Sequence, residues 1–273
     1  MKNRAPVLSP VRPDAPPPLD DESAAPPDGV RDGDDLARET DELLERLASA
    51  QGTLIAEGSR ALLVVLQGRD ASGKDGLIRK VFGAFNPMGC HVTAFAAPSD
   101  EELSHDFLWR VHANAPRRGM VAVFNRSHYE DVLAVRVREL VLPRVWERRF
   151  DHINAFERLL VDEGTTVIKF FLHVSRDEQT KRLRKRIEDP RKNWKFRAGD
   201  LEDRELWDEY AVAIHDVLAR CSTQWAPWYV VPADDKRVRD YLVAQVVAAT
   251  LDHMDPAYPP PQADLTEYLD VLE

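Results

Sequence analysis

Five short runs of apolar residues, separated by segments with helical periodicity, constrain the fold of this chain more than any other feature. The runs are residues 61–67, 91–97, 120–125, 165–174 and 228–233. Short apolar runs that alternate with helices indicate parallel strands whose two faces are both covered by helices. The sequence therefore predicts a three-layer α/β domain around a five-stranded parallel sheet. Sheets of this kind bind ligands at the carboxyl ends of their strands.

The two ends of the chain differ in composition from this central part. Residues 1–34 are rich in Pro, Asp and Ala, and we expect a disordered tail there because such residues bury little surface. The folded domain is assigned to residues 35–255 and begins with a helix over 36–57. Residues 256–273, which start in a proline-rich stretch, are expected to form a loose C-terminal tail.

The charge of the chain limits the partners it can have. A formal net charge of −10 argues against general nucleic-acid binding, so an anion site has to be a local basic patch. Cys90 and Cys221 have neither metal-ligand spacing nor a disulfide framework, which fits a reducing cytoplasm. The N-terminus has no signal-peptide core, and no run approaches the roughly 18 apolar residues of a membrane span. We expect a cytoplasmic protein that binds neither nucleic acid nor membrane.

A glycine motif follows the first apolar run, where residues 68–76 read GRDASGKDG. The spacing G-x-x-x-x-G-K between a strand and a helix is typical of a loop whose backbone N–H groups bind phosphate. We predict that Gly68, Ser72, Gly73 and Lys74 bind phosphate, with Lys74 adding a positive charge. A glycine-rich turn with a surface lysine is the less favoured interpretation.

The metal site of such a loop is altered here. The residue after the lysine is Asp75, where a magnesium-binding Ser or Thr is usual, and the third apolar run ends in Asn125, where an Asp is usual. The loop itself contains Asp70, and carboxylates are suitable Mg²⁺ ligands. We predict Asp70 as the main ligand. Asp75 is either a second ligand or a charge that stabilises the start of the helix, and the sequence leaves both open.

The residues after the third apolar run, FNRSHYED, lie where ligands bind in a parallel sheet. Arg126 is suited to bind a phosphate through two N–H groups. Glu130 has the chemistry to reach a metal or a substrate hydroxyl. We interpret His128 as a hydrogen-bonding residue and not as a phosphohistidine, because direct phosphoryl transfer needs no covalent carrier.

Two groups of basic residues complete the set of candidates. Residues 181–197 contain nine Lys or Arg and two acidic residues, which indicates a helical lid over about 181–200 that closes on phosphates. The predicted phosphate-binding residues of the lid pair on helical faces: Arg182 with Arg186, and Lys181 with Lys185. A solvated charged helix is the alternative. Arg117 and Arg118 either hold the phosphate of a nucleotide or are simply exposed.

Several segments together resemble the polyphosphate kinase 2 family. They are LLVVLQGRDASGKDG, FLWRVHANAPRRG, VFNRSHYEDVL, DEGTTVIKFFLHVSRDEQTKRL, PRKNWKF, GDLEDRELWDEY and APWYVVPA, within residues 36–255. The resemblance implies a P-loop kinase fold close to that of thymidylate kinase. It implies Mg²⁺-assisted phosphoryl transfer between inorganic polyphosphate and a nucleotide, by a homodimer or homotetramer.

The resemblance also implies roles for individual residues. Asp70 and Lys74 match the family's loop, and Asn125 and Arg126 match the start of its second motif. On this resemblance, Asn125, Arg126 and Glu130 are expected to contact the nucleotide. Arg126 and Lys74 would stabilise charge during direct in-line transfer. The form NRSHYED resembles branches that accept AMP, or both AMP and ADP, whereas GRD in the loop is also found in diphosphate-type members. Adenine nucleotides are expected, with guanine nucleotides as a second option.

Two other functions compete with this interpretation. An ATP-dependent nucleoside monophosphate kinase has the same fold, but its loop more often keeps Ser or Thr after the lysine. A noncatalytic phosphate-binding scaffold would need no catalytic constellation, which the presence of Asp70, Lys74 and Arg126 argues against. A comparison of polyphosphate and ATP as donors separates these functions.

Overall fold

The computed structural model describes residues 7–30, 33–261 and 265–272. Its centre is a sheet of β1 (Ala61–Gly68), β2 (Cys90–Ala94), β3 (Val121–Asn125), β4 (Thr165–His173) and β5 (Trp228–Pro232). The strand order is β2-β3-β1-β4-β5, and all neighbouring strands are parallel. The prediction of a five-stranded parallel sheet is confirmed.

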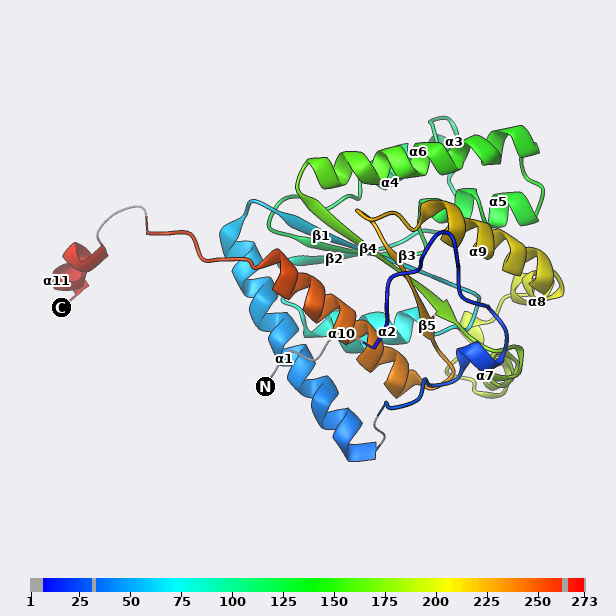
Figure 1. Cartoon of the computed structure of the whole chain (residues 1–273), viewed down its shortest axis with the longest axis horizontal. Helices are drawn as coiled ribbons and strands as arrows, with labels where there is room; N and C mark the ends of the chain where they lie inside the picture. Colours follow the sequence, from blue (N-terminus) through cyan, green and yellow to red (C-terminus); the bar gives the residue numbers. More distant parts are fainter. Residues whose placement is uncertain (1–6, 31–32, 262–264, 273) are drawn as a thin grey trace.

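Helices cover both faces of this sheet (Figure 1). One face packs against α1 (Gly33–Glu57), α2 (Lys74–Val81) and α10 (Lys236–Met254). The other packs against α6 (Pro143–Asp162) and α9 (Trp207–Cys221). The central strand shows why both layers form: Leu62 and Val64 face the first layer and Leu63 faces the second. Side chains of a strand alternate between its two faces, so a wholly apolar strand needs cover on both.

Shorter elements connect this framework. The remaining α-helices are α3 (Asp100–Leu103), α4 (Trp109–His112), α5 (Ala134–Val137), α7 (Arg176–Glu188), α8 (Gly199–Glu205) and α11 (Leu269–Leu272). The 3-10 helices are η1 (Glu22–Ala24), η2 (Phe82–Ala84), η3 (His128–Asp131), η4 (Asn193–Lys195) and η5 (Leu265–Tyr268). No helix among the described residues has both the length and the apolar character that a membrane crossing requires.

Residues 7–30 pack against the edge of the sheet formed by β5, in contrast to the disordered tail that we expected over the first 34 residues. Val11 is buried, and its N–H donates to Trp228 O in β5 (2.8 Å). Further along, Arg176 N at the start of α7 donates to Asp21 Oδ1 (2.8 Å). The segment thus binds through its backbone and a few side chains, which its polar composition did not indicate. Residues 1–6 and 31–32 of the expected tail lie outside the described residues.

Beyond α10, residues 256–261 form no regular secondary structure. The backbone N–H of Ala257 donates to Glu57 Oε2 at the end of α1 (3.3 Å). Residues 262–264 and 273 lie outside the described part of the chain. The loose C-terminal tail over 256–273 therefore stays a prediction.

Candidate active site

The glycine motif forms the connection between β1 and α2, at the carboxyl end of the central strand. Gly73 has a φ of 102°, in the region that favours glycine. A Cβ atom at this position would collide with Nη1 of the buried Arg239. The tight contact explains the second glycine of the motif. The strand–loop–helix arrangement expected for a phosphate-binding loop is present.

Lys74 is buried within this loop, with 8% of its surface exposed. Its Nζ donates to Gly68 O (2.6 Å) and to Arg69 O (3.3 Å). Burial lowers the pKa of Lys74 to about 8, and the positive charge of Arg126 acts in the same direction. The ammonium group is therefore placed where an added anion would stabilise its charged form.

Arg126 faces the loop from the end of β3. Its Nη2 donates to Asp70 Oδ1 (2.7 Å), and the Asp70 side chain is 16% exposed. Arg126 has a φ of 62°, a left-handed conformation that costs free energy in a residue with a side chain. The backbone N–H of Arg126 is bound to Leu66 O (3.0 Å), which fixes this turn to the central strand. Asp70, Lys74 and Arg126, all predicted from the sequence, are thus brought together.

Glu130 lies in the same cluster, close to Arg126 and Lys74. Its burial raises the pKa of Glu130, while the two neighbouring cations oppose that shift. With its amide oriented to satisfy both partners, Gln67 donates to Glu130 Oε1 (3.0 Å) and accepts from Ser127 N (3.1 Å). Gln67 was not predicted from the sequence, although a polar residue at the end of an apolar run was a usable signal.

Asp75 joins three elements at the front of the loop. Asn125 Nδ2 donates to Asp75 Oδ1 (3.0 Å), and Lys195 Nζ donates to Asp75 Oδ2 (2.9 Å). Partial burial opposes ionisation, but the hydrogen bonds from Lys195 and Asn125 outweigh it and lower the pKa of Asp75. Both carboxylate oxygens therefore have protein partners. This arrangement adds a third role, attachment of the lid segment to the loop, to the two roles that the sequence left open.

The predicted lid residues differ in their surroundings. Lys181 and Lys185 on α7 are exposed to solvent. Arg186 is partly buried, and its Nη1 donates to Asp200 Oδ2 (2.9 Å). The Arg182 side chain is only 9% exposed and donates to backbone carbonyls of the loop instead of facing solvent. The prediction that Arg182 holds substrate phosphate is therefore corrected, because the spacing of a helix shows which residues share a face but not what that face contacts.

Arg117 and Arg118 are not brought to this site. They precede β3, whereas the site lies at the carboxyl end of that strand. A five-residue strand separates the two ends by roughly 16 Å. Arg118 instead pairs at 3.7 Å with Glu163, after α6. A contact of these arginines with a phosphate at the loop is not formed here, since the amino ends of parallel strands meet at the opposite edge of the sheet. Both side chains are exposed, in agreement with the other interpretation that the sequence left open.

His128 is fully buried behind the site. Its Nε2 lies 3.2 Å from Glu157 Oε1, which also accepts from the hydroxyl of Tyr129 (2.8 Å). Lys169 donates to both Glu157 and Tyr129. The hydrogen-bonding interpretation of His128 agrees with this network, which anchors the residues that follow Arg126.

Arg69 is a loop residue whose role the sequence did not reveal. Its guanidinium carbon lies 3.8 Å from the centre of the Trp207 ring, and its Nη2 donates to Trp207 O (2.8 Å). Burial lowers the pKa of Arg69 to about 10. The contact attaches the phosphate loop to the start of α9, nearly 140 residues later in the chain. Only the folded structure brings these two positions together.

The possible metal ligands at the loop are of the kind that Mg²⁺ prefers. Among the residues that the structure describes, no group of three or more His, Cys, Asp or Glu has the arrangement of a metal site. Mg²⁺ in phosphoryl-transfer enzymes usually takes one or two carboxylates and completes its shell with substrate phosphates and water. The carboxylate of Asp70, within the phosphate loop, is consistent with a metal shared with the substrate.

The chain is similar over most of its length to proteins of one kind. The family model described as "Polyphosphate kinase 2" matches residues 31–259. An AMP/ADP-polyphosphate phosphotransferase from Meiothermus ruber is 52% identical over 220 residues, which cover 81% of this chain and 82% of the relative. An ADP-polyphosphate phosphotransferase from Rhodopseudomonas palustris is 45% identical over 228 residues, 79% of each chain. The crystal structure of a polyphosphate kinase 2 from Arthrobacter aurescens has a TM-score of 0.88 at 40% identity, covering 92% of this chain and 90% of that one.

Proposed function

The chain belongs to the polyphosphate kinase 2 family, and from this premise we propose that it transfers phosphoryl groups between inorganic polyphosphate and AMP or ADP. The observation that carries the proposal is the convergence of Lys74, Asp70 and Arg126 at the carboxyl ends of β1 and β3. The Arg126–Asp70 contact measures 2.7 Å, and Lys74 is buried in the loop next to them. Two cations beside the carboxylate of Asp70, at a phosphate loop, form a site for the transfer of a phosphoryl group.

The residues of the site support direct, in-line transfer. Lys74 and Arg126 neutralise the charge that spreads over the transferred group, which is the main demand of phosphoryl transfer. The oxygen of an acceptor phosphate is already ionised at neutral pH, so the reaction needs no strong general base. His128 is buried in a hydrogen-bonded network, which supports a mechanism without a phosphohistidine. Glu130 and Gln67 hold the residues around Arg126 in place.

Mg²⁺ is proposed as the cofactor, with Asp70 as its protein ligand. When bound, the ion would neutralise phosphate charge and orient the donor and the acceptor. Asp70 also holds the Arg126 guanidinium in position through the contact between Arg126 Nη2 and Asp70 Oδ1. Asp75 is the weaker candidate ligand, because Asn125 and Lys195 already bind its two oxygens.

Exposed basic residues beside the loop suit a polyanionic donor. Lys181, Arg184 and Lys185 lie on α7, and all three are exposed. Flexible Lys and Arg side chains that lie along a chain of phosphates can bind that chain, and they need no pocket for a base or a sugar. We assign the donor chain to these residues and the nucleotide phosphate to the Arg126 side of the site. Both AMP and ADP are proposed as acceptors, with adenine preferred over guanine.

Assembly into a homodimer or homotetramer is part of the proposal. The strand β2 forms one edge of the sheet, and its Val92 is 42% exposed. Met88 and Leu103, which flank this edge in the sequence, are 82% and 65% exposed. Exposed apolar side chains next to a free strand edge favour association. Light scattering on the purified protein measures the mass directly, and a monomer would contradict this part of the proposal.

A reducing compartment, the cytoplasm, is proposed from the cysteines. Cys90 and Cys221 are both free thiols. Burial raises the pKa of Cys90 to about 11 and that of Cys221 to about 12, so both stay protonated near neutral pH. Oxidised and reduced protein should therefore show the same activity under mild conditions.

The donor assay tests the proposed function. Purified protein is mixed with Mg²⁺, AMP or ADP, and either polyphosphate or ATP, and the nucleotides are resolved by chromatography. We expect ADP or ATP to form from polyphosphate. Transfer from ATP to AMP without transfer from polyphosphate would favour a nucleoside monophosphate kinase. Binding of phosphate without turnover from either donor would favour a scaffold.

A further inference from the structure

Two side chains of α7 donate hydrogen bonds to backbone carbonyls of the phosphate loop. Gln179 Nε2 donates to Asp70 O (3.0 Å). Arg182 Nη1 donates to Ala71 O (3.1 Å) and to Ser72 O (3.0 Å). Three consecutive carbonyl groups of the loop are thus held by two side chains from a helix about 110 residues later in the chain.

Arg182 has no N–H group left for a substrate. A guanidinium group carries five N–H donors, and two of them bind the loop. Nε donates to Glu178 Oε1 (2.8 Å), and Nη2 donates to Ala233 O (2.6 Å) and Asp234 O (2.8 Å). All five donors therefore have acceptors within the protein. The side chain links the loop, α7 and the connection between β5 and α10.

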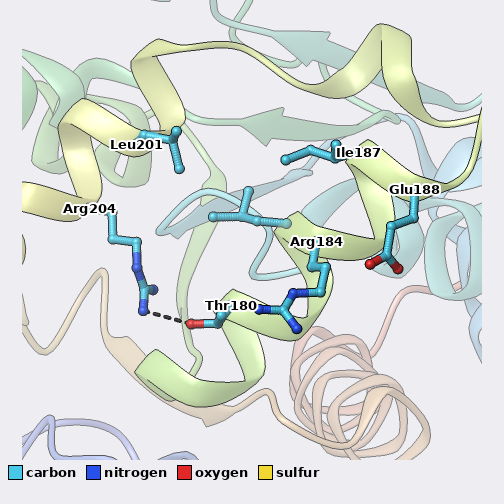
Figure 2. A pocket seen from close by; sticks show the side chains of 7 residues that line it. Thr180, Arg184, Ile187, Glu188, Leu201 and Arg204 are labelled. Atoms are coloured by element: carbon cyan, nitrogen blue, oxygen red, sulfur yellow. Dashed lines mark hydrogen bonds between the residues drawn. The ribbon is translucent and has the colours of Figure 1, made fainter.

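Gln179 is fixed in a single orientation. The residue is 2% exposed, and its Oε1 accepts from Arg204 Nη1 (2.5 Å). Arg204 reaches from α8 to α7, where it also donates to Thr180 Oγ1 (2.6 Å), the contact drawn as a dashed line in Figure 2. Because Arg204 offers only donors, the amide oxygen of Gln179 has to face it. The amide N–H group then points at the loop carbonyl of Asp70.

Holding these carbonyls orients the N–H groups of the loop. The C=O and N–H of one peptide unit point in opposite directions, so carbonyls turned toward α7 turn the following N–H groups away from it. Within the described part of the chain, the N–H groups of Ala71 and Gly73 meet no acceptor. Ala71 has a φ of 61°, a conformation that a residue with a side chain adopts only when its surroundings enforce it.

We propose that Gln179 and Arg182 are positioning residues for phosphoryl transfer, which hold the loop carbonyls so that the free N–H groups face the transferred phosphate. The inference rests on the proposed function of the loop. In this proposal the two faces of α7 have different roles. Its buried face, with Gln179 and Arg182, belongs to the fixed site, whereas its exposed face, with Arg184 and Lys185, is left for the donor chain.

Hydrogen exchange of the ligand-free protein tests the positioning directly. In Arg182→Ala, the backbone amides of residues 68–76 should exchange about tenfold faster than in the wild type, because two hydrogen bonds to the loop are lost. Arg184→Ala, an exposed arginine on the same helix, is the matched control and should exchange like the wild type. Unchanged exchange in Arg182→Ala would overturn the proposal. This measurement needs no turnover, so its outcome is independent of whether polyphosphate is the substrate.

Kinetics separate positioning from direct binding of the donor. We expect kcat of Arg182→Ala to fall about 100-fold, as for a site displaced by about 1 Å, while KM for polyphosphate changes less than about threefold. Guanidinium at millimolar concentration should restore part of kcat, and NaCl at equal ionic strength should not. A raised KM with kcat preserved would show instead that Arg182 binds the donor, and would overturn the proposal.

A second variant keeps the test valid if Arg182→Ala does not fold. Gln179→Glu retains an acceptor for Arg204 but removes the donor to Asp70 O. Faster exchange of the loop and a lower kcat, with KM for polyphosphate unchanged, would support the proposal. Wild-type exchange together with wild-type kcat would overturn it. If the wild type shows no polyphosphate-dependent activity, the proposed function fails, and the exchange data alone decide the role of these two residues.

Discussion

The phosphate loop and the exposed face of α7 both place positive charge near the same end of the sheet, but they hold it in different ways. Lys74 is buried and donates to two backbone carbonyls, whereas Lys181 and Lys185 are in solvent. A charge fixed by hydrogen bonds in a buried site acts strongly on one group of atoms. A solvated charge on a flexible side chain attracts any phosphate of a long chain. This difference is the basis of our proposal that the loop carries out the phosphoryl transfer and that the exposed face of α7 captures the donor.

The largest effect is expected at the fixed charge. Lys74→Ala should lower kcat about 1000-fold, because it removes a preorganised cation from the transferred group. Turnover of AMP with polyphosphate measures this, and the melting temperature shows whether the protein stays folded. Lys185→Ala, on the exposed face of α7, is the comparison: it should leave kcat nearly unchanged and raise only KM for polyphosphate. Similar losses of kcat in the two variants would contradict the different roles proposed for the loop and for the exposed face of α7.

Asp70→Asn should lower kcat about 100-fold at a fixed magnesium concentration, because the carboxylate is both the proposed metal ligand and the partner of Arg126. A titration with Mg²⁺ should show a higher requirement than in the wild type. Asp75→Asn is the matched variant, and it should keep the wild-type requirement if Asp75 serves to attach Lys195. If only Asp75→Asn raised the magnesium requirement, the metal ligand would be Asp75 and not Asp70.

The pH dependence follows from the lowered pKa of Lys74, about 8, which burial causes. Below that pH the ammonium form is present, and above it the charge is lost. We therefore expect kcat/KM for polyphosphate to fall about tenfold per pH unit above about 8, since kcat/KM reports the free enzyme. Lys74→Arg should move this fall to higher pH, because the guanidinium group keeps its charge. A flat profile up to pH 10 would contradict the assignment.

Reversal of two exposed charges, Arg184→Glu with Lys185→Glu, should raise KM for polyphosphate about tenfold and leave kcat nearly unchanged. The effect should shrink as salt is added, because screening weakens exposed charges. The control reverses Arg144 and Arg148, two exposed arginines of α6, and changes the net charge equally. Equal effects of both double variants would show that only net charge matters.

The smallest effect on activity is expected from removal of residues 1–30. Loss of the buried Val11 and its backbone contact with β5 should lower the melting temperature by about 5 °C. The phosphate loop is not touched, so kcat at 25 °C should stay within about twofold. Thermal unfolding and initial rates measure the two quantities. A large loss of kcat would show that the contact between Asp21 and the start of α7 supports the site.

Local patterns in the sequence predicted the fold well. Five apolar runs indicated the parallel sheet, and the spacing of Gly68, Gly73 and Lys74 indicated the loop, because both depend on neighbouring residues. Residues 7–30 were misjudged, since a segment that binds through backbone atoms needs little apolar composition.

The partners of individual side chains could not be predicted in the same way. Helical periodicity placed Arg182 and Arg186 on one face but could not show that this face packs on the loop. Gln179 carries no local signal, since its partner Asp70 is more than 100 residues away in the chain. Contacts of this kind depend on how α7 packs against the loop between β1 and α2, which no short segment encodes.

Labelled polyphosphate tests the central claim most directly. The protein is incubated with ³²P-polyphosphate, unlabelled AMP and Mg²⁺, in the absence of ATP, and the nucleotides are separated from free phosphate. The proposed mechanism predicts that the label appears in the β-phosphate of ADP in the wild type and is absent from nucleotide in Lys74→Ala. Label found only as inorganic phosphate, or equal transfer in both proteins, would contradict it.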